Sequence, residues 1–440
     1  ACFSPQCFNS SGLDQRDFSY WIWLYTSVGG NRAGRNAFCR SVAARAHLWT
    51  VLIDPDGFTG DIYRSSGVKP TTCRHERGLS PLAEGLERRI AAEGPITIAA
   101  FMAEALMHPT HGYYAQSDPF GIDGDFTTAP EICQIFGELI GLWCADIWRQ
   151  MGAPKEIALA ELGPGRGTLM ADALRAAAVL PAFRKAVSVH LVEASPFLRS
   201  RQEQALAAFL PTWHETVASL PDVPTLLIAN EFFDALPIHQ FVFTSDGWRE
   251  RLVTSVDGVF AVIVSPQPTP RARLIDDGIN AKAKVGDMAE VCPAGLSVME
   301  AISAKITQYG GAALIVDYGS MEPLARPTLQ SVRSHKAHDF LEAPGSADIT
   351  AHVDFAALGR AAIRPAPPQV KCWGPISQAD FLMRLGLAER AARLAANASE
   401  RQVKDIETAC HRLIAAEEMG TLFKVFAISA GGTIIPPAFE

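Results

Sequence analysis

From about residue 156 onwards, short apolar runs alternate with amphipathic segments, and this alternation constrains the fold more than any other feature. Short apolar runs suit buried strands, whereas longer segments with helical periodicity suit helices. Strands that alternate with helices favour a mostly parallel sheet with helices on both faces, so the sequence predicts an α/β, Rossmann-like fold. The expected elements are strand 157–162, helix 167–179, strand 187–192, helix 196–209, strand 225–229 and strand 312–316.

A glycine-rich segment directly follows the first of these strands. Gly163, Gly165 and Gly167 would allow a tight turn and the close approach of a ligand to the backbone. Their spacing, followed by Thr168, does not match the Gly-x-Gly-x-x-Gly pattern of dinucleotide-binding proteins. Glu161 stands where methyltransferases place an acid that faces the methionine end of their cofactor. We therefore expect this segment to bind S-adenosyl-L-methionine, and the alternative is a plain glycine-rich turn.

Acidic residues also follow two later strands, and in open α/β sheets ligands bind at the carboxyl ends of strands. Glu193 could accept hydrogen bonds from both ribose hydroxyls of the cofactor, or could simply be exposed to water. Glu231 and Asp234 could clamp a guanidinium group between two carboxylates, and we group them with Asn230 as candidate catalytic residues. The alternative for this second set is a helix start, with Asn230 as the cap and Glu231 in the first turn.

A long loop with small, acidic and aromatic residues runs from His111 to Thr128. It is too long to be only a connector, so we expect a lid over cofactor and substrate, with structural packing as the alternative. His111 and Tyr114 are the candidate substrate contacts, and Asp125 is a candidate cofactor contact. Thr128 and Glu131 have the spacing of a capping box and predict that a long helix begins there.

Composition excludes several other functions. The formal net charge is −8, but residues 1–80 carry 9 basic and 6 acidic side chains, which leaves 30 basic and 41 acidic ones, or −11, for the rest. An acidic body argues against binding to nucleic acid. The nine cysteines form no Cys-x-x-Cys pair, so no metal site is expected. No apolar run reaches the roughly 18 residues that a membrane helix needs, so we expect no membrane insertion.

Eight segments along the chain together carry a resemblance. They are His111-Gly-Tyr-Tyr114, Gly124-Asp-Phe-Thr-Thr-Ala-Pro-Glu131, Glu161-Leu-Gly-Pro-Gly-Arg-Gly-Thr168, Val192-Glu-Ala-Ser-Pro196, Ala229-Asn-Glu-Phe-Phe-Asp-Ala-Leu-Pro237, Val316-Asp-Tyr-Gly319, Asp348-Ile-Thr-Ala351 with Val353-Asp-Phe355, and Met419-Gly-Thr-Leu-Phe-Lys424. In this order they resemble the MidA-like family of class I methyltransferases, which includes a mitochondrial complex I assembly factor. The resemblance runs from about Leu82 to the C-terminus.

The resemblance implies a class I methyltransferase fold with additional elements and S-adenosyl-L-methionine as the cofactor. It further implies a protein arginine N-methyltransferase whose substrate is a subunit of respiratory complex I or an equivalent protein. The expected location is the mitochondrial matrix in a eukaryote and the cytoplasm in a bacterium. Two rival functions stay open here: a non-catalytic assembly chaperone on the same fold, and a nucleotide-dependent oxidoreductase.

The chain of 440 residues suits one large elaborated domain or two. We expect an extension over 1–78 that is not needed for catalysis, for which a disordered segment, an arginine-rich targeting segment and wrongly joined upstream sequence are the alternatives. A helical and lid region over 79–155 and the methyltransferase domain over 156–440 follow. Insertions are expected at about 240–310, where alternation suggests antiparallel strands, and at about 320–420, where helices 378–396 and 400–418 precede a last strand.

Overall fold

A computed structural model describes residues 80–116, 127–364, 370–432 and 434–440. The part of the chain from Ser80 to Glu440 forms one compact unit. The expected extension over 1–78 and the candidate cofactor contact Asp125 lie outside the described residues. Of the described helices, none combines the length and the apolar character needed to cross a membrane.

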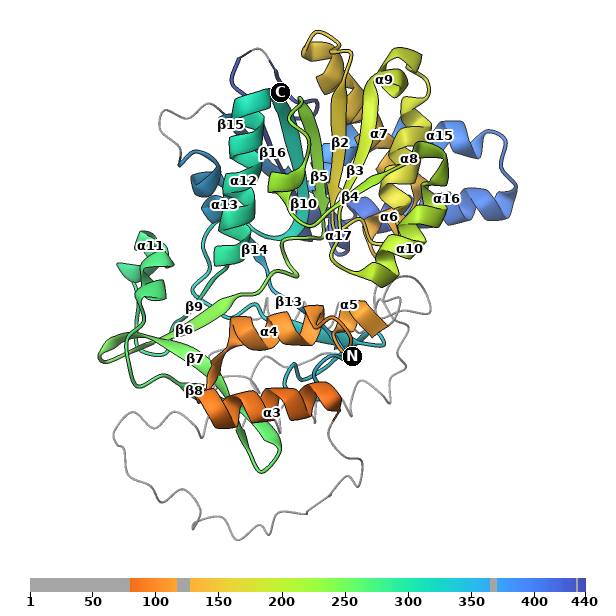
Figure 1. The fold of residues 1–440 in the computed structure, drawn as a ribbon. Helices are drawn as coiled ribbons and strands as arrows, with labels where there is room; N and C mark the ends of the chain where they lie inside the picture. Colours follow the sequence, from red (N-terminus) through yellow and green to blue (C-terminus); the bar gives the residue numbers. More distant parts are fainter. Residues whose placement is uncertain (1–79, 117–126, 365–369, 433) are drawn as a thin grey trace, which may run out of the picture. The chain divides into compact units, whose positions relative to one another are not determined.

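The main sheet has eight strands, with the order β4-β3-β2-β5-β10-β16-β15 and the short β14 beside the end of β10 (Figure 1). All of the central strands run parallel except β16, which is antiparallel to both β10 and β15. The expected strands 157–162 and 187–192 match β2 and β3 residue for residue. The strands are β2 Ile157–Leu162, β3 Val187–Val192, β4 Thr212–His214, β5 Thr225–Asn230, β10 Gly311–Ser320, β14 Val353–Asp354, β15 Val370–Ser377 and β16 Phe423–Ala430.

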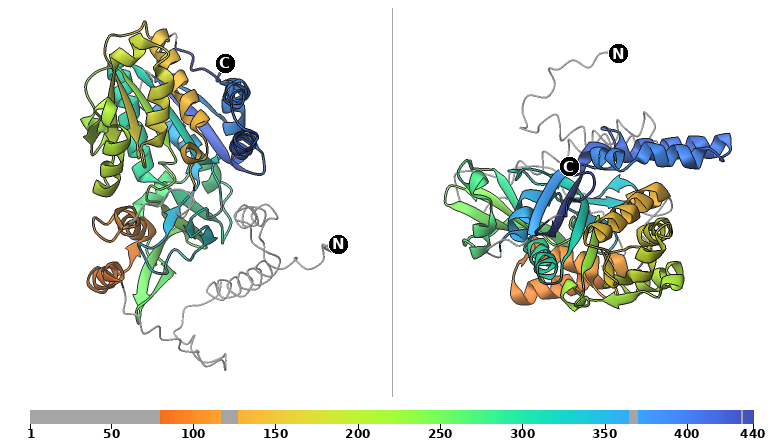
Figure 2. Two further views of the ribbon diagram at one scale, coloured as in Figure 1. Left: turned by 90° about the vertical axis from the view of Figure 1, so that its right-hand side faces the viewer. Right: turned by 90° about the horizontal axis from the view of Figure 1, so that it is seen from above.

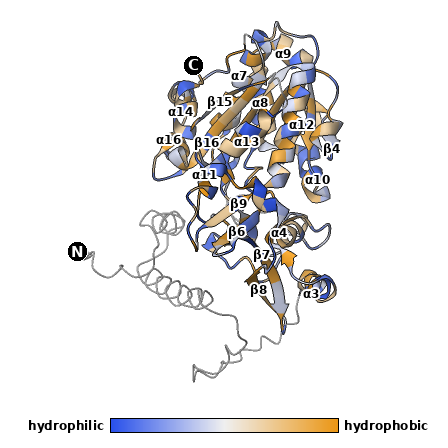
Figure 3. Ribbon diagram, turned by 90° about the vertical axis from the view of Figure 1, so that its left-hand side faces the viewer, coloured by the Kyte–Doolittle hydropathy of each residue, from blue (hydrophilic) through white to orange (hydrophobic). Residues whose placement is uncertain are grey.

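Helices cover both faces of this sheet, as the alternating pattern predicted. Helices α7 (Gln134–Gln150) and α8 (Thr168–Ala177) pack on one face, and α12 (Pro293–Tyr309) and α13 (Phe355–Ala362) pack on the other. Every residue of β2 and β5 is buried, which is expected for parallel strands that lie between two helical layers. Apolar residues run along the central strands, whereas the helices carry both apolar and polar residues (Figure 3).

A second sheet of antiparallel strands, most of which follow β5, confirms the antiparallel strands expected within 240–310. Within the stretch expected as an insertion, 240–310, this β-region ends at Val291, and α12 packs on the main sheet through Met299, Ile302 and Ile306. Helices α3 (Pro81–Glu93) and α4 (Ile98–Met107) pack against the second sheet. Its strands are β1 Ile96–Thr97, β6 His239–Thr244, β7 Gly247–Val256, β8 Val259–Val264 and β9 Met288–Val291.

The stretch expected as the second insertion, 320–420, holds a small sheet and a group of helices. The small sheet joins β11 (Gln330–Arg333) to β12 (Lys336–Ala337) and β13 (Asp348–Thr350). The single helix expected over 378–396 is wrong, because Gly386 takes a left-handed backbone (φ 92°) and separates α14 from α15. The helices are α14 Gln378–Arg384, α15 Leu387–Ala395 and α16 Glu400–Ile414. In Figure 2 these helices, coloured blue, lie together on one side of the sheet.

The remaining elements are short. They are α5 Tyr113–Gln116, α6 Ala129–Ile132, α9 Pro181–Ala186, α10 Pro196–Ala205, η2 Ala207–Phe209, η3 Val217–Ser219, η4 Pro270–Leu274, α11 Asp277–Asn280 and α17 Met419–Leu422.

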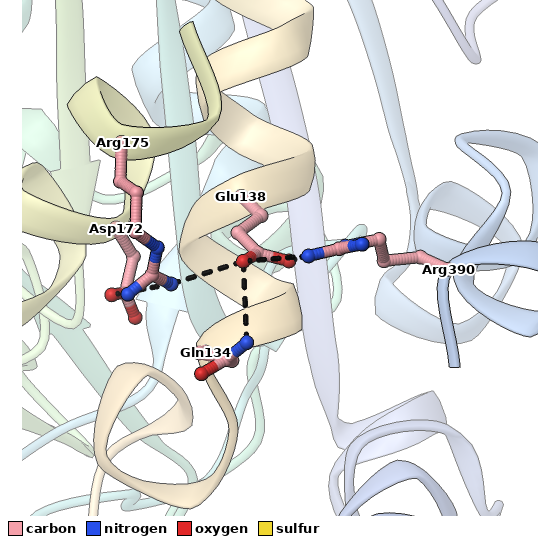
Figure 4. A network of polar contacts seen from close by, with 5 residues as sticks. All are labelled: Gln134, Glu138, Asp172, Arg175 and Arg390. Carbon is pink, nitrogen blue, oxygen red and sulfur yellow. Dashed lines mark hydrogen bonds and ion pairs between the residues drawn. The ribbon is translucent and has the colours of Figure 1, made fainter. Parts of the chain in front are cut away.

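A buried glutamate connects the main sheet's helices to the C-terminal helices (Figure 4). Glu138 on α7 is 3% exposed and forms ion pairs with Arg390 of α15 at 2.6 Å and with Arg175 of α8 at 3.0 Å. Gln134, one turn earlier, donates a further hydrogen bond to it. Burial raises the pKa of Glu138, but the hydrogen bonds and charges of the two arginines outweigh this and lower it. The network therefore fixes α15 to the helical layer of the sheet.

Candidate active site

The glycine-rich segment forms the turn between β2 and α8. Gly163, Gly165 and Gly167 all have left-handed backbones, with φ of 58°, 54° and 84°, which is why glycine suits these positions. A Cβ atom added to Gly163 would lie 3.0 Å from the Phe232 side chain. The turn therefore packs directly against the segment that follows β5, and the two candidate binding segments form one site.

Glu161, near the end of β2, is buried within this site with 3% of its surface exposed. Its Oε2 atom has no hydrogen-bond partner among the described residues. Burial, followed by the charge of Glu193, raises the pKa of Glu161 to about 8. Burying a carboxyl group without a partner is costly, so this position favours a ligand that brings a positive charge or a hydrogen-bond donor.

Glu193, at the end of β3, is held in one orientation by two hydrogen bonds. Its Oε1 atom accepts from the Ser195 backbone N–H at 2.8 Å, and its Oε2 atom accepts from Gln202 Nε2 at 3.0 Å. Gln202 Nε2 also donates to the carbonyl of Gly165 at 2.8 Å, and the Trp213 indole donates to Gln202 Oε1. Gln202, which the sequence analysis did not single out, thus connects the candidate ribose acid to the glycine turn.

The segment after β5 bends sharply at Glu231, whose backbone is left-handed with φ of 50°. A non-glycine residue in this region is strained, and such strain concentrates at functional sites. Hydrogen bonds hold the bend: Glu231 N–H donates to Val316 O at 2.8 Å, and Glu231 Oε1 accepts from Ala129 N–H at 3.1 Å and Asn230 Nδ2 at 3.2 Å. No helix begins at Asn230 in the described part of the chain, so the helix-start alternative is wrong.

Asp317, near the end of the parallel neighbour β10, positions this bend. It is fully buried, and its Oδ2 atom accepts hydrogen bonds from the backbone N–H groups of Phe233 at 2.9 Å and Asp234 at 3.3 Å. Burial, together with the charges of Asp234 and Glu231, raises its pKa well above the ordinary range. Asp317 was not among the candidate site residues, although an acid near the end of a buried strand was an available signal in the sequence.

Asp234 lies deeper than Glu231 and is 6% exposed. Its backbone carbonyl accepts from Ala351 N–H at 3.0 Å, and the Tyr318 side chain forms a hydrogen bond with its carboxyl group. Among the described residues its Oδ1 atom has no hydrogen-bond partner, and neither has Asn230 Oδ1. Burial raises the pKa of Asp234, and burial with the charge of Asp234 raises the pKa of Glu231 to about 8.

Tyr114 connects the two halves of the site. Its backbone carbonyl accepts a hydrogen bond from Ser195 Oγ at 2.8 Å, beside Glu193, and its hydroxyl donates to Asp348 Oδ1 at 3.2 Å. Burial, then the charges of Asp348 and Asp234, raises the pKa of Tyr114 well above its usual value. The structure therefore brings Tyr114 close to the carboxylates.

His111 lies in the turn between α4 and α5, where its described contacts are with His108 rather than with the site carboxylates. The two imidazole rings stack at 5.2 Å, and His111 N–H donates to His108 Nδ1 at 3.1 Å. His111 also has a further interaction. Its expected role as a substrate contact stays a prediction.

The capping box expected at Thr128 is wrong. The Thr128 side chain forms no capping hydrogen bond, and α6 ends at Ile132 before α7 begins. The Glu131 carboxylate instead accepts from Thr168 Oγ1 at 2.5 Å and pairs with Arg166 at 3.1 Å, both in the glycine turn and the start of α8. Helix α6 therefore contacts the glycine turn through Glu131, while its first N–H group donates to Glu231.

Three oxygen atoms in this site that lack hydrogen-bond partners share one chemical property. Glu161 Oε2, Asn230 Oδ1 and Asp234 Oδ1 are all buried acceptors. A ligand that completes them must donate hydrogen bonds, and the acidic surroundings favour positive charge. Within the described ranges, no cluster of three or more His, Cys, Asp or Glu side chains is arranged to hold a metal ion.

The chain is similar to a known protein family and to several characterised relatives. Residues 139–368 match the family described as "putative S-adenosyl-L-methionine-dependent methyltransferase". The chain is 37% identical over 380 residues to the mitochondrial protein arginine methyltransferase NDUFAF7 of Xenopus tropicalis, covering 79% of this chain and 86% of the relative. It is 36% identical to the human NDUFAF7 over 394 residues, covering 83% and 86%.

A solved structure shows the same architecture. The crystal structure of a protein from Burkholderia thailandensis bound to S-adenosyl-homocysteine superposes with a TM-score of 0.71 at 30% identity. The match covers 82% of this chain and 94% of the bacterial protein.

Proposed function

The chain belongs to the family of S-adenosyl-L-methionine-dependent methyltransferases with a class I fold, and from this premise we propose that it methylates a guanidinium nitrogen of arginine in a protein. The single observation that carries the acceptor is the pair of unpartnered buried oxygens, Asn230 Oδ1 and Asp234 Oδ1, beside Glu231. A guanidinium group has five N–H donors, no acceptor and a permanent positive charge, so it can donate to both of these unpartnered oxygens. The relatives named above are protein arginine methyltransferases, which supports the same acceptor.

The residues of the glycine turn fit the cofactor. Gly163 has the left-handed backbone that glycine adopts readily, and the unpartnered Glu161 Oε2 suits the ammonium group of a methionine moiety. Glu193 is oriented by Ser195 and Gln202 to accept from ribose hydroxyls. When bound, S-adenosyl-L-methionine supplies an electrophilic methyl group on its sulfonium.

The acceptor half of the site must make a guanidinium nitrogen nucleophilic without removing its proton first. With an arginine pKa of about 12.5–13.8, prior deprotonation at pH 7 would cost roughly 8 kcal/mol at about 1.36 kcal/mol per pH unit. Glu231 and Asp234 can instead hold the positive charge on one nitrogen and leave the other more nucleophilic. Proton loss to solvent then accompanies or follows transfer. Fixing the acceptor in line with the methyl group can contribute about 7–11 kcal/mol.

A second part of the proposal concerns which protein carries the methylated arginine. Its support is the kinship with relatives whose names place them in mitochondria. From the resemblance we propose a subunit of respiratory complex I, or its bacterial equivalent, as the acceptor protein. We propose the mitochondrial matrix as the location in a eukaryote and the cytoplasm in a bacterium.

The direct test combines purified protein, methyl-labelled S-adenosyl-L-methionine and cell lysate, followed by mass spectrometry of the labelled peptides. We expect ω-N-methylarginine on one or a few proteins and inhibition by added S-adenosyl-homocysteine. Gly163→Val, in which the added side chain meets Phe232 and strains the left-handed turn, serves as the cofactor-deficient control. Label on another residue type, or no transfer by protein that binds the cofactor in calorimetry, would contradict the proposal.

A further inference from the structure

A pocket distinct from the cofactor turn lies between the second sheet and the helices α12 and α13. It has a volume of about 80 Å³, and buried apolar side chains form much of its wall. Phe233, Ile238, Ile275 and Leu358 are the main apolar contributors. Figure 1 shows the surrounding elements α11, β9, β14, α12 and α13 in its left half. Neither Glu161 nor Glu193 is among the described residues that line it.

The pocket shares its wall with the acceptor half of the site. Phe233 lines it and directly precedes Asp234 in the chain. Ala351 also lines it, and the Ala351 N–H donates to the Asp234 carbonyl at 3.0 Å. The ring of His352, a third lining residue, packs edge-on against Tyr318 at 5.4 Å. A ligand in this pocket would therefore lie beside the residues that we propose hold the target arginine.

The size of the pocket limits what can occupy it. At about 10–15 Å³ for each water-sized sphere, its volume has room for roughly six such spheres. That space suits a few carbon atoms, such as one branched aliphatic side chain, and is small for a nucleoside. The apolar walls favour the same occupant, because burying an aliphatic side chain removes apolar surface from water.

The polar part of the pocket is acidic. Four carboxylates and one guanidinium group line the pocket, so their formal charges sum to −3. Arg360 forms an ion pair with the lining residue Asp276 at 3.2 Å, and its positive charge reduces this sum to −2. Burial lowers the pKa of His352 to about 4, so this imidazole is neutral at pH 7. The charge therefore complements a basic peptide. The lining charged residues are Asp276, Glu290, Glu322, Asp354 and Arg326.

We propose that this pocket is a subsite for the substrate protein, in which one aliphatic side chain of a basic segment is seated next to the target arginine. The proposal rests on the arginine methyl transfer proposed above and adds the determinant that selects among arginines. The aliphatic side chain fills the apolar wall, and basic residues around it face the acidic rim. The occupant is a segment of the methyl-acceptor protein.

The test measures binding of short synthetic peptides by fluorescence anisotropy, with the 440-residue chain saturated with S-adenosyl-homocysteine. Each peptide has a central arginine in a basic, glycine-rich background, and a leucine is moved through the flanking positions one at a time. We expect one leucine position to bind roughly ten-fold more tightly than the leucine-free peptide. Replacing the basic flanks with acidic residues should weaken binding, and more so at low salt.

Ala357→Leu is the variant that fills the pocket, because Ala357 lines it from α13. Ala356→Leu is the matched control: it lies on the same helix but is not among the lining residues. We expect Ala357→Leu to lose the leucine preference while keeping its melting temperature and its affinity for S-adenosyl-homocysteine. Ala356→Leu should keep all three properties.

Three results would overturn the subsite: no leucine preference in the unaltered protein, an equal loss in both variants, or retention of the preference in Ala357→Leu. Methyl transfer to the same peptides is followed separately by mass spectrometry. Position-specific leucine binding without arginine methylation would support the subsite and contradict the proposed function. Arginine methylation without any leucine preference would support the proposed function and contradict the subsite.

Discussion

Glu231 combines two unfavourable features at one residue, a left-handed backbone and a largely buried carboxyl group. The first costs about 1–3 kcal/mol, and the second raises the pKa of the group to about 8. Backbone hydrogen bonds to Asp317 and Val316 keep the surrounding bend in place despite this cost. Because this backbone conformation and this burial both cost stability, a role of Glu231 in binding a cation explains them better than a role in stabilising the fold.

The raised pKa of Glu231 predicts a pH dependence of turnover. The proposed guanidinium clamp requires ionised carboxylates on Glu231 and Asp234, and an arginine acceptor stays protonated throughout the neutral range. Because kcat/KM reports the groups of the free enzyme, we expect it to rise with pH up to about 8, the pKa of Glu231. Initial rates at subsaturating acceptor and saturating cofactor measure this. A value that falls over the same interval would show that the protonated form is the active one.

Glu193 gives a prediction for the cofactor alone. Its two hydrogen-bonded oxygens are oriented by Ser195 and Gln202, and the ribose that it would contact is common to substrate and product. Glu193→Ala should therefore weaken S-adenosyl-L-methionine and S-adenosyl-homocysteine alike, by about 1.5–3 kcal/mol each. Calorimetry compares the variant with Glu203→Ala, an exposed control on α10. Loss of affinity for only one ligand would refute the ribose assignment.

At the scale of elements, the short helix α6 joins the two halves of the site. Glu131 contacts the glycine turn and the start of α8, while the Ala129 N–H donates to Glu231. The capping pattern at Thr128 could not reveal this, because tertiary contacts to Thr168 and Arg166 compete for the same carboxylate. The spacing of two residues in the sequence can predict a hydrogen bond between neighbours, whereas the partners of Glu131 lie more than 30 residues away along the chain.

The same distinction explains what the sequence could and could not predict. Strands β2 and β3 were predictable to the residue, since β2 is apolar except for Glu161 and apolar residues alternate with Ser188 and His190 in β3. The break at Gly386 was missed because helical periodicity continues on both sides of it. Gln202 and Asp317 were missed because their partners are distant in sequence, Gly165 for the first and the Phe233 N–H for the second.

Glu138 supports a prediction about how the helices are held together. In Glu138→Gln the two arginines lose their charged partner, and we expect a loss of about 1–3 kcal/mol in unfolding free energy at pH 7. Because its folded pKa is lowered, its contribution is present above the unfolded pKa of about 4.3 and is lost as pH falls through the folded value. The difference from the unaltered protein should therefore shrink in acid.

Urea unfolding at neutral and acidic pH measures this difference, with the exposed Glu156→Gln as the control. Equal stability of Glu138→Gln and the unaltered protein at pH 7 would mean that the network in Figure 4 does not stabilise the fold.

At the scale of the whole molecule, the carboxyl edge of the main sheet brings together the two halves of the candidate site. The proposed cofactor half comes from the ends of β2 and β3, and the proposed acceptor half from the ends of β5 and β10. This convergence was predictable, because parallel strands end at a common edge. The contribution of the inserted sheets was not predictable: β13 supplies Asp348 to Tyr114, and the pocket depends on the second sheet.

We propose that Glu231 and Asp234 hold the methyl acceptor and not the cofactor. The most direct test of this claim is to measure, in Glu231→Gln and Asp234→Asn, both methyl transfer to the identified substrate and the affinity for S-adenosyl-homocysteine. We expect cofactor affinity within a few-fold of the unaltered protein and a loss of turnover of roughly 100-fold or more, as for an interaction needed in the transition state. Full methyl transfer by both variants would contradict the claim and assign these carboxylates to the fold alone.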